Sequence, residues 1–152
     1  MPKLLPIWPM AAPTRASEIE YERFRAPLFA RKGWALIYLV DDDDAVRDSL
    51  ALLLGAHGFE VAAFASAAEF AQVPRRQEKA CLILDHHLPG MTGLEFLASP
   101  AGAALDLPVI LITGMADSSL SARARALGVC AFLEKPVSES RLLGAIARAL
   151  ES

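Results

Sequence analysis

Short apolar runs and segments of helical periodicity alternate along the chain from Trp34 onward. The apolar runs are rich in β-branched and aromatic side chains and lack regular alternation with polar residues, which is typical of strands covered on both faces. They predict five strands, at residues 35–40, 59–64, 80–84, 109–113 and 130–135.

After each run, apolar residues recur every three or four positions and predict an amphipathic helix. In the first of these helices Val46, Leu50 and Leu54 lie on one face, and Gly58 provides a left-handed stop. The predicted helices span residues 45–57, 66–73, 93–98, 118–127 and 137–150. Five β/α units in series predict an α/β fold, a doubly wound five-stranded parallel sheet with helices on both faces.

The composition agrees with a globular domain. Of 152 residues, 54% are hydrophobic and 22% charged, which excludes collagen, a disulfide scaffold and disorder throughout. Cys81 and Cys130 lie in apolar stretches without metal-ligand spacing, so we expect buried free thiols and a cytoplasmic location. No apolar window approaches the roughly 18 residues that a membrane span needs, and no membrane insertion is expected.

Charge divides the chain into two parts. Residues 1–33 hold six basic and three acidic residues and five of the ten prolines, whereas the remainder holds nine basic and fifteen acidic residues. We therefore expect a loosely ordered N-terminal extension over residues 1–33 and one domain over residues 34–152. The acidic domain is a poor candidate for direct nucleic-acid binding.

Chemically active side chains follow the predicted strands. Asp41 and Asp42 follow the first strand, Asp85 the third, Thr113 ends the fourth and Lys135 ends the fifth. Because the carboxyl ends of parallel strands share one edge of a sheet, these groups should converge. Three carboxylates in a small crevice need a cation, and their oxygen atoms favour Mg²⁺, with Mn²⁺ possible.

Each of these residues also has an ordinary structural interpretation. The run Asp41–Asp44 is compatible with a solvated acidic turn, but an EF-hand is excluded because Val46 and Leu52 occupy positions that need Gly and Glu. Asp43 and Asp44 are expected to stabilise the start of the following helix. Lys135 alone would be an ordinary surface lysine.

Four fragments in order resemble the response-regulator receiver domain, specifically its FixJ-type branch. They are VDDD (40–43), LILDHHLPGMTGLEFL (82–97), PVILITG (108–114) and FLEKP (132–136). The resemblance covers about residues 35–150 and implies a flavodoxin-like fold of the receiver type. It also implies a phosphoacceptor of two-component signalling, phosphorylated by a sensor histidine kinase or a phosphotransfer protein.

The resemblance assigns roles residue by residue. Asp85 would be the phosphoacceptor, Asp42 a direct Mg²⁺ ligand, and Asp41 a ligand through metal-bound water. The main-chain carbonyl of His87 would complete the protein ligands. Thr113 would hydrogen-bond the phosphoryl group, Lys135 would pair with it, and the peptide bond from Lys135 to Pro136 would be cis.

The resemblance also implies a switch made of Thr113 and Phe132, in which the aromatic ring turns inward when the threonine moves toward the phosphoryl group. Alternation along the last strand places Phe132 on the face opposite Leu133 and Lys135, beside the helix that carries Arg123 and Arg125. An ordinary strand aromatic packed against the last helix is the alternative. We expect a downstream protein or a second copy of the chain to bind at the surface formed by residues 118–127, 130–135 and 137–150.

His86 and His87 adjoin the proposed phosphoacceptor. We interpret them as two exposed loop histidines, with an influence on phosphoryl lifetime or added metal affinity as the alternative. Since only Glu151 and Ser152 follow Leu150, we expect a stand-alone receiver without a DNA-binding output domain, which is a phosphoacceptor and not an enzyme. Two other classes of protein are alternatives. A pseudo-receiver, an interaction module that takes no phosphate, is disfavoured because the acidic site residues and the lysine are all present. A hydrolase with an aspartyl-phosphate intermediate is disfavoured because Asp41 and Asp43 are followed by Ala45, and not by the threonine of a DxDxT arrangement.

Overall fold

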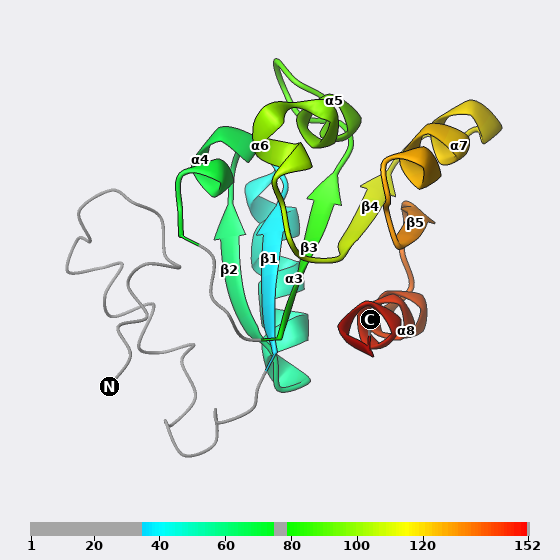
Figure 1. Ribbon diagram of the computed structural model, residues 1–152. Helices are drawn as coiled ribbons and strands as arrows, with labels where there is room; N and C mark the ends of the chain where they lie inside the picture. The colour runs from blue at the N-terminus through cyan, green and yellow to red at the C-terminus, as the bar shows by residue number, and fades with distance from the viewer. Residues whose placement is uncertain (1–34, 75–78, 152) are drawn as a thin grey trace.

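The five strands form one parallel sheet in the order β2-β1-β3-β4-β5, as Figure 1 shows. The computed structural model describes residues 35–74 and 79–151, so the predicted extension at 1–33 lies outside the described residues. The order confirms the predicted doubly wound α/β fold, because the chain moves outward in both directions from β1 and β3. The strands are β1 (Leu36–Val40), β2 (Glu60–Phe64), β3 (Ala80–Asp85), β4 (Val109–Thr113) and β5 (Ala131–Glu134).

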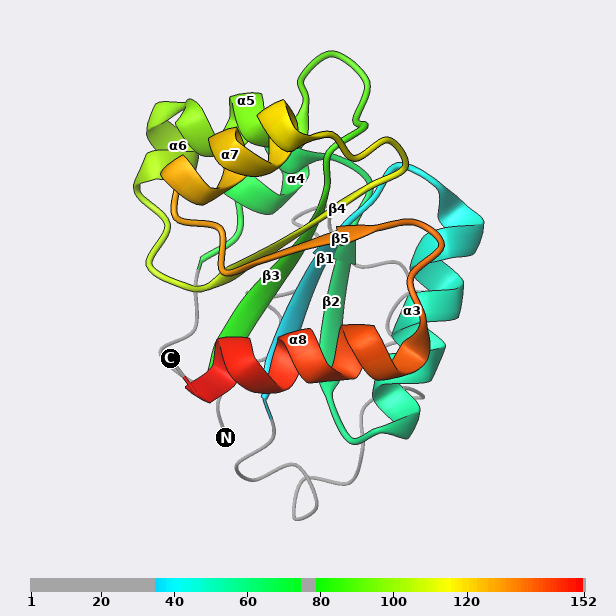
Figure 2. The same cartoon turned by 90° about the vertical axis from the view of Figure 1, so that its right-hand side faces the viewer.

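Helices cover both faces of this sheet. Helices α4, α5 and α7 lie on one face, and α3 and α8 lie on the other, as the two perpendicular views show (Figures 1 and 2). The helices are α3 (Asp44–Ala56), α4 (Ala67–Ala71), α5 (Gly93–Ala98), α6 (Pro100–Ala103), α7 (Ser118–Ala126) and α8 (Glu139–Glu151). None of the helices in the described part of the chain has the length and apolar character that crossing a bilayer demands.

The continuous apolar character of the strands is explained by two separate cores. In β1, the buried side chains of Leu36, Tyr38 and Val40 pack toward α4, α5 and α7, while Ile37 and Leu39 pack toward α3 and α8. Each residue of β1 is therefore buried whichever way it points, and a strand of this kind carries no polar alternation.

One helix was not predicted, and another begins later than predicted. Helix α6 was not predicted, because four residues are too few to show periodicity; it begins where the Ser99 hydroxyl accepts the Gly102 N–H. Helix α8 begins at Glu139 and not at 137, because Ser138 Oγ accepts the Arg141 N–H at 3.3 Å. The peptide bond from Lys135 to Pro136 is cis, as the resemblance implied.

The two cysteines occupy different environments. Cys81 on β3 is fully buried, and this burial raises the pKa of its thiol to about 12. Cys130 is exposed, so the prediction that both thiols are buried was wrong for this residue. Cys130 lies in the turn before the edge strand β5, where an apolar sequence neighbourhood does not ensure a covering layer.

Helix α3 is less deeply packed than its apolar periodicity predicts. Leu54 is fully buried, but Val46 and Leu50 remain half-buried and Leu52 is 64% exposed. The half-buried pair lies at the end of the helix nearest to Asp41, where the helix and the segment after β5 enclose a cavity.

Candidate functional site

The residues at the carboxyl ends of the strands meet at one edge of the sheet. Asp41 follows β1, Asp85 and Thr113 are the last residues of β3 and β4, and Lys135 follows β5. The adjacent strands hold this edge in register, since Asp85 pairs with Ile112 and the Lys135 N–H donates to the Thr113 carbonyl at 2.7 Å. The parallel order thus brings together side chains that are up to 94 positions apart in sequence.

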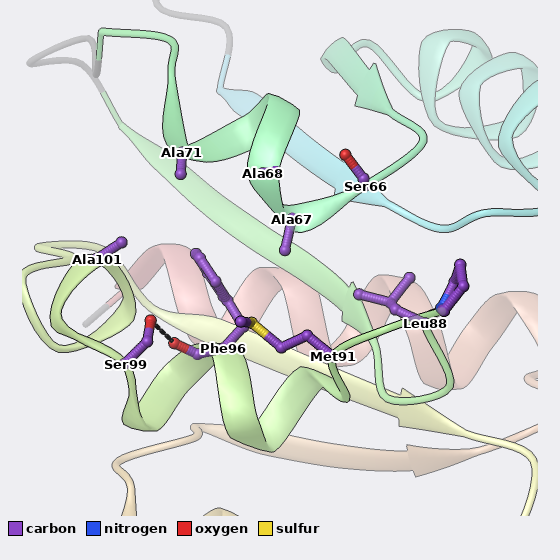
Figure 3. A pocket seen from close by; sticks show the side chains of 10 residues that line it. Ser66, Ala67, Ala68, Ala71, Leu88, Met91, Phe96, Ser99 and Ala101 are labelled. Carbon is purple, nitrogen blue, oxygen red and sulfur yellow. Dashed lines mark hydrogen bonds between the residues drawn. The ribbon is translucent and has the colours of Figure 1, made fainter.

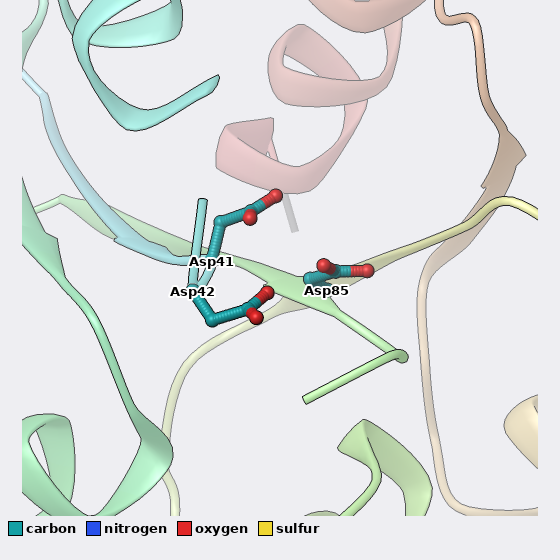
Figure 4. A group of neighbouring side chains, drawn as sticks. All are labelled: Asp41, Asp42 and Asp85. Atoms are coloured by element: carbon teal, nitrogen blue, oxygen red, sulfur yellow. The ribbon is translucent and has the colours of Figure 1, made fainter. Parts of the chain in front are cut away.

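Three carboxylates form an acidic cluster at this edge. Asp41, Asp42 and Asp85 each offer an oxygen atom, and these atoms all lie within 4.8 Å of one another. Figure 4 shows the three side chains converging beyond the ends of β1 and β3. Asp41 and Asp85 are 3% and 4% exposed, whereas Asp42 is open to solvent. Hard oxygen donors at this spacing, with one side open to water, fit Mg²⁺ or Mn²⁺.

The two buried carboxylates of the cluster are held by the protein. Asp41 Oδ1 accepts the Asp43 N–H at 2.9 Å, and Asp85 Oδ1 accepts the His87 N–H at 3.2 Å. Lys135 Nζ contacts both of the other oxygen atoms, at 3.4 Å from Asp41 Oδ2 and 3.3 Å from Asp85 Oδ2. The lysine therefore bridges the two strands that carry the carboxylates.

The surroundings of Asp85 oppose the charged form of its carboxyl. Burial of the Asp85 carboxyl and the neighbouring charge of Asp41 raise its pKa above the ordinary value, although the His87 N–H and the Lys135 ammonium oppose this. Burial lowers the pKa of Lys135, but the charges of Asp85 and Asp41 outweigh it and leave that pKa raised. The lysine thus remains a cation, while a further positive charge would favour ionisation of Asp85.

The start of α3 fixes the acidic turn. Asp43 is the N-cap of this helix, and its carboxylate accepts the N–H groups of Ala45 and Val46 at 2.9 and 3.2 Å. Arg47 donates to the Asp41 carbonyl at 2.7 Å and also contacts Asp44. These contacts confirm the structural interpretation of Asp43.

The loop after Asp85 approaches α5 very closely. Gly93 donates its N–H to the His86 carbonyl at 2.8 Å, and a Cβ at this glycine would lie 2.8 Å from the Asp85 carbonyl oxygen. Any larger residue at position 93 would push the loop that carries Asp85 away from the helix.

The two loop histidines are not equivalent. His86 is 9% exposed, so the prediction of two exposed histidines was wrong for this residue; only His87 is exposed. Backbone bonds hold His86 in place, since its N–H donates to the Ile112 carbonyl at 2.8 Å. Burial is the main cause that lowers the pKa of His86.

The side chain of His87 makes a contact that the sequence did not predict. Its Nε2 lies 3.0 Å from Oγ1 of Thr113, a side chain with no exposed surface. The resemblance concerned only the main-chain carbonyl of His87, and no sequence pattern relates a loop residue to a side chain 26 positions further along.

A cavity of about 580 Å³ opens beside the acidic cluster. Asp41, Asp85 and Lys135 form its charged part, while its apolar walls come from α3, the strand ends, the segment after β5 and α8. The apolar lining residues include Ala45, Val46, Leu50, Pro136, Val137 and Leu142.

A second, smaller cavity lies elsewhere on the molecule and lacks such chemistry. It measures about 270 Å³ and lies between α4 and α5, as Figure 3 shows. Its lining consists of alanines, serines, Pro89 and the side chains of Leu88, Met91 and Phe96, with no charged group among them. The strand-end cavity is therefore the candidate functional site.

Phe132 lies on the face that alternation predicts. It is half-buried against the core that contains Leu120 and Ala124 of α7, whereas Leu133 belongs to the core on the α8 side. The alternative that Phe132 packs against the last helix is therefore wrong.

The fold and the strand-end carboxylates define the flavodoxin-like class of α/β domains with an acidic receiver site. A family model of the response regulator receiver domain matches residues 37–147, so the chain belongs to this family of two-component signalling proteins. Members of the family act as phosphoacceptors, bind Mg²⁺ through acidic residues, and interact with histidine kinases or phosphotransfer proteins.

Individual relatives agree with this assignment. The chain is 38% identical over 117 residues to nodulation protein W of Bradyrhizobium diazoefficiens, covering 77% of this chain and 52% of that protein. It is 37% identical over 114 residues to the transcriptional regulatory protein FixJ of Azorhizobium caulinodans, covering 75% and 54%. The chain thus spans about half the length of these curated relatives.

Solved structures show the same architecture. The response regulator StyR superposes with a TM-score of 0.70 at 36% identity, over 78% of this chain and 60% of that one. A CheY-like receiver domain protein from Methanospirillum hungatei gives a TM-score of 0.69 at 31% identity, over 78% of this chain and 94% of that one.

Proposed function

We propose that Asp85 accepts a phosphoryl group from a phosphohistidine of a sensor histidine kinase or phosphotransfer protein, and that phosphorylation alters the contacts of the domain with other proteins. The observation that carries this proposal is the buried Asp85 carboxylate at the end of β3, within 4.8 Å of two further carboxylates and 3.3 Å from a lysine.

In the proposed reaction an oxygen atom of Asp85 forms a bond to phosphorus. The bond between phosphorus and the donor imidazole nitrogen breaks, and its electron pair stays on that nitrogen. Negative charge accumulates on the equatorial phosphoryl oxygens, so the protein acts mainly by placement and by its field. Lys135 supplies a cation beside Asp85, and the hydroxyl of Thr113 would donate a hydrogen bond to the phosphoryl group.

The acidic cluster would hold Mg²⁺, with Mn²⁺ as a possible substitute. Asp42 would bind directly because its carboxylate faces solvent. Asp41 would act through metal-bound water, the role that the receiver family implies for this position. Asp85 and the main-chain carbonyl of His87 would complete the set. The bound cation would neutralise charge on the carboxylates and the phosphoryl oxygens.

The donor would approach through the strand-end cavity. A protein donor must place its imidazole next to Asp85, and the half-buried Val46 and Leu50 offer an apolar wall beside that carboxylate. Burial of apolar surface at this wall would contribute to binding of the donor protein.

The phosphorylated state would be detected on the surface formed by α7, β5 and α8. Phe132 connects this surface with β4, because it pairs with Leu111 two residues before Thr113. A rotamer change of the half-buried aromatic ring would alter the apolar area offered to a downstream protein or to a second copy of the chain. Such a shift requires contacts that differ between the two states.

The receiver domain would extend over residues 34–152, with residues 1–33 as a separate N-terminal extension. All proposed site residues lie between Asp41 and Lys135. The domain would take part in its own phosphorylation and dephosphorylation without acting on a separate substrate.

Intact mass spectrometry after incubation with Mg²⁺ and acetyl phosphate tests this proposal. The wild type should gain the mass of one phosphoryl group, and Asp85→Asn should gain none, because an amide keeps the shape but lacks the nucleophilic oxygen. Stoichiometric phosphorylation of the Asp85→Asn protein would reject Asp85 as the acceptor.

A further inference from the structure

His87 contacts both the proposed phosphoacceptor and the threonine that would bind the phosphoryl group. Its main-chain N–H donates to Asp85 Oδ1 at 3.2 Å, and its ring Nε2 lies 3.0 Å from Thr113 Oγ1. One loop residue therefore joins the proposed phosphoacceptor on β3 to the threonine on β4. The ring contact is made by the side chain and the acceptor contact by the backbone, so the two can be separated by mutation.

The hydrogen-bonding capacity of Thr113 is limited. A hydroxyl has one proton and two acceptor lone pairs. The Met115 N–H donates to Thr113 Oγ1 at 3.1 Å, and the Met115 carbonyl is a distant acceptor at 3.4 Å. The contact with His87 is the shortest of the three. In either tautomer of the imidazole this contact fixes the position of Oγ1.

His86 restricts the ring of His87. The rings meet edge to face, with centroids 5.1 Å apart and an interplanar angle of 72°. The backbone of His86 is anchored, because its carbonyl accepts the N–H groups of Leu88 and Gly93 at 3.1 and 2.8 Å. Within the described residues, the buried Nδ1 of His86 has no hydrogen-bond partner, so the ring of His86 meets His87 without a polar contact of its own at that nitrogen.

We propose that His87 is a positioning residue that holds Thr113 Oγ1 in its unphosphorylated position. The inference rests on the proposed function, in which Thr113 moves to donate to a phosphoryl group on Asp85. That movement lengthens or breaks the contact between Thr113 and His87. The His87 side chain is therefore a brake on the switch, since it stabilises one of the two states.

Beryllofluoride, a phosphoryl mimic, tests the brake without the complication of hydrolysis. Its affinity is measured by titration calorimetry in Mg²⁺ at one fixed pH. His87→Ala removes the ring but keeps the N–H and the carbonyl, and it should bind beryllofluoride about two- to ten-fold more tightly, the equivalent of one net hydrogen bond. His87→Gln can restore a polar nitrogen or oxygen near Thr113 Oγ1 and should bind like the wild type.

A double-mutant cycle shows whether His87 acts through Thr113. In a Thr113→Val background, His87→Ala and His87→Gln should have equal affinities. Met91→Ala changes another exposed side chain of the same loop and should leave the affinity unchanged. Weaker or unaltered binding by His87→Ala, or tightening that persists in the Thr113→Val background, would overturn the brake while leaving the proposed function intact.

The contact itself can be detected before any ligand is added. The ¹⁵N chemical shift of His87 Nε2 should change in Thr113→Val relative to the wild type, because a hydrogen-bond partner is removed. An unchanged shift would contradict the contact. Failure of the wild type to bind beryllofluoride in Mg²⁺ would overturn the proposed function and the brake together.

Discussion

Asp85 carries its negative charge in surroundings that oppose ionisation. Because burial and Asp41 raise its pKa in the folded protein, its contribution to stability is full below the ordinary value of 3.8 and is lost as the pH rises through the raised value. Without metal at pH 7, Asp85→Asn should therefore unfold at a higher temperature than the wild type, and the difference should shrink as the pH falls below 4. Thermal unfolding in EDTA at both pH values measures this, and a less stable variant at pH 7 would contradict it.

Asp42 provides the corresponding test for the cation. Mg²⁺ that binds only the folded protein should raise the melting temperature, and at about 100 times its dissociation constant it contributes about 2.7 kcal/mol. Asp42→Ala should lose most of this gain, while Asp48→Ala on the exposed side of α3 should keep it. Equal shifts in the wild type and in Asp42→Ala would place the cation elsewhere.

Single residues differed in how far the sequence could predict them. Asp41, Asp85 and Lys135 were identified because each terminates or follows an apolar run, and strand ends of a parallel sheet must meet. The burial of His86 and the contact between His87 and Thr113 depend on the path of a loop, which has no periodicity. The sequence therefore predicted the polar edge but not the loop contacts within it.

At the scale of elements, helix α3 offers two leucines for a comparison of docking with chemistry. Leu50 lines the cavity beside Asp85, whereas Leu52 is 64% exposed and is absent from the cavity wall. Leu50→Arg should slow phosphotransfer from a protein donor about ten-fold, as expected for an interface residue worth about 1.4 kcal/mol. Transfer from acetyl phosphate should remain near the wild-type rate, because the reacting groups are unchanged.

Leu52→Arg is the matched control, since it adds the same charge to the same helix. It should leave both transfer rates unchanged. Equal slowing by the two variants, or slowing of the acetyl phosphate reaction by Leu50→Arg, would show that the apolar wall is not a docking surface for the donor. Both reactions can be followed by intact mass spectrometry over time.

The positions of strands and helices were predictable where the hydrophobic pattern alone determined them. The buried strands were found because doubly covered strands form uninterrupted apolar runs, and β4 matches its predicted bounds. Helix ends depended on single side chains such as Ser138, and the partial exposure of Val46 and Leu50 depended on how far α3 stands from the segment after β5. Periodicity reports which residues share a face, not how closely a neighbour covers that face.

At the scale of the whole molecule, the N-terminal extension can be separated from the phosphoacceptor chemistry. The described sheet already has five strands, and every proposed site residue lies C-terminal to Val40. Removal of residues 1–33 should therefore leave phosphorylation by acetyl phosphate at the wild-type rate. Loss of cooperative unfolding or of phosphorylation in the shortened chain would show that the boundary at Trp34 is wrong.

The readout of phosphorylation depends on communication from the site to a distant surface. Thr113 lies at the end of β4, and hydrogen bonds connect this end to β5. The Lys135 N–H donates to the Thr113 carbonyl, and the Glu134 carboxylate accepts the Ala116 N–H at 3.4 Å. Movement of Thr113 would therefore displace β5, where Phe132 is half-buried against α7. A small displacement could change the apolar area of the surface formed by α7, β5 and α8.

Phe132→Ala should separate phosphorylation from its consequence. Asp85 should still accept a phosphoryl group, because Phe132 is not among the residues that line the cavity beside it. The phosphorylation-dependent change in association should be lost, since alanine has no ring to move between two positions. Light scattering with and without beryllofluoride measures self-association, and a pull-down measures binding of a target. Phe132→Leu keeps apolar bulk and should retain part of the change. Equal phosphorylation-dependent association of the wild type and Phe132→Ala would exclude Phe132 as the link between site and surface.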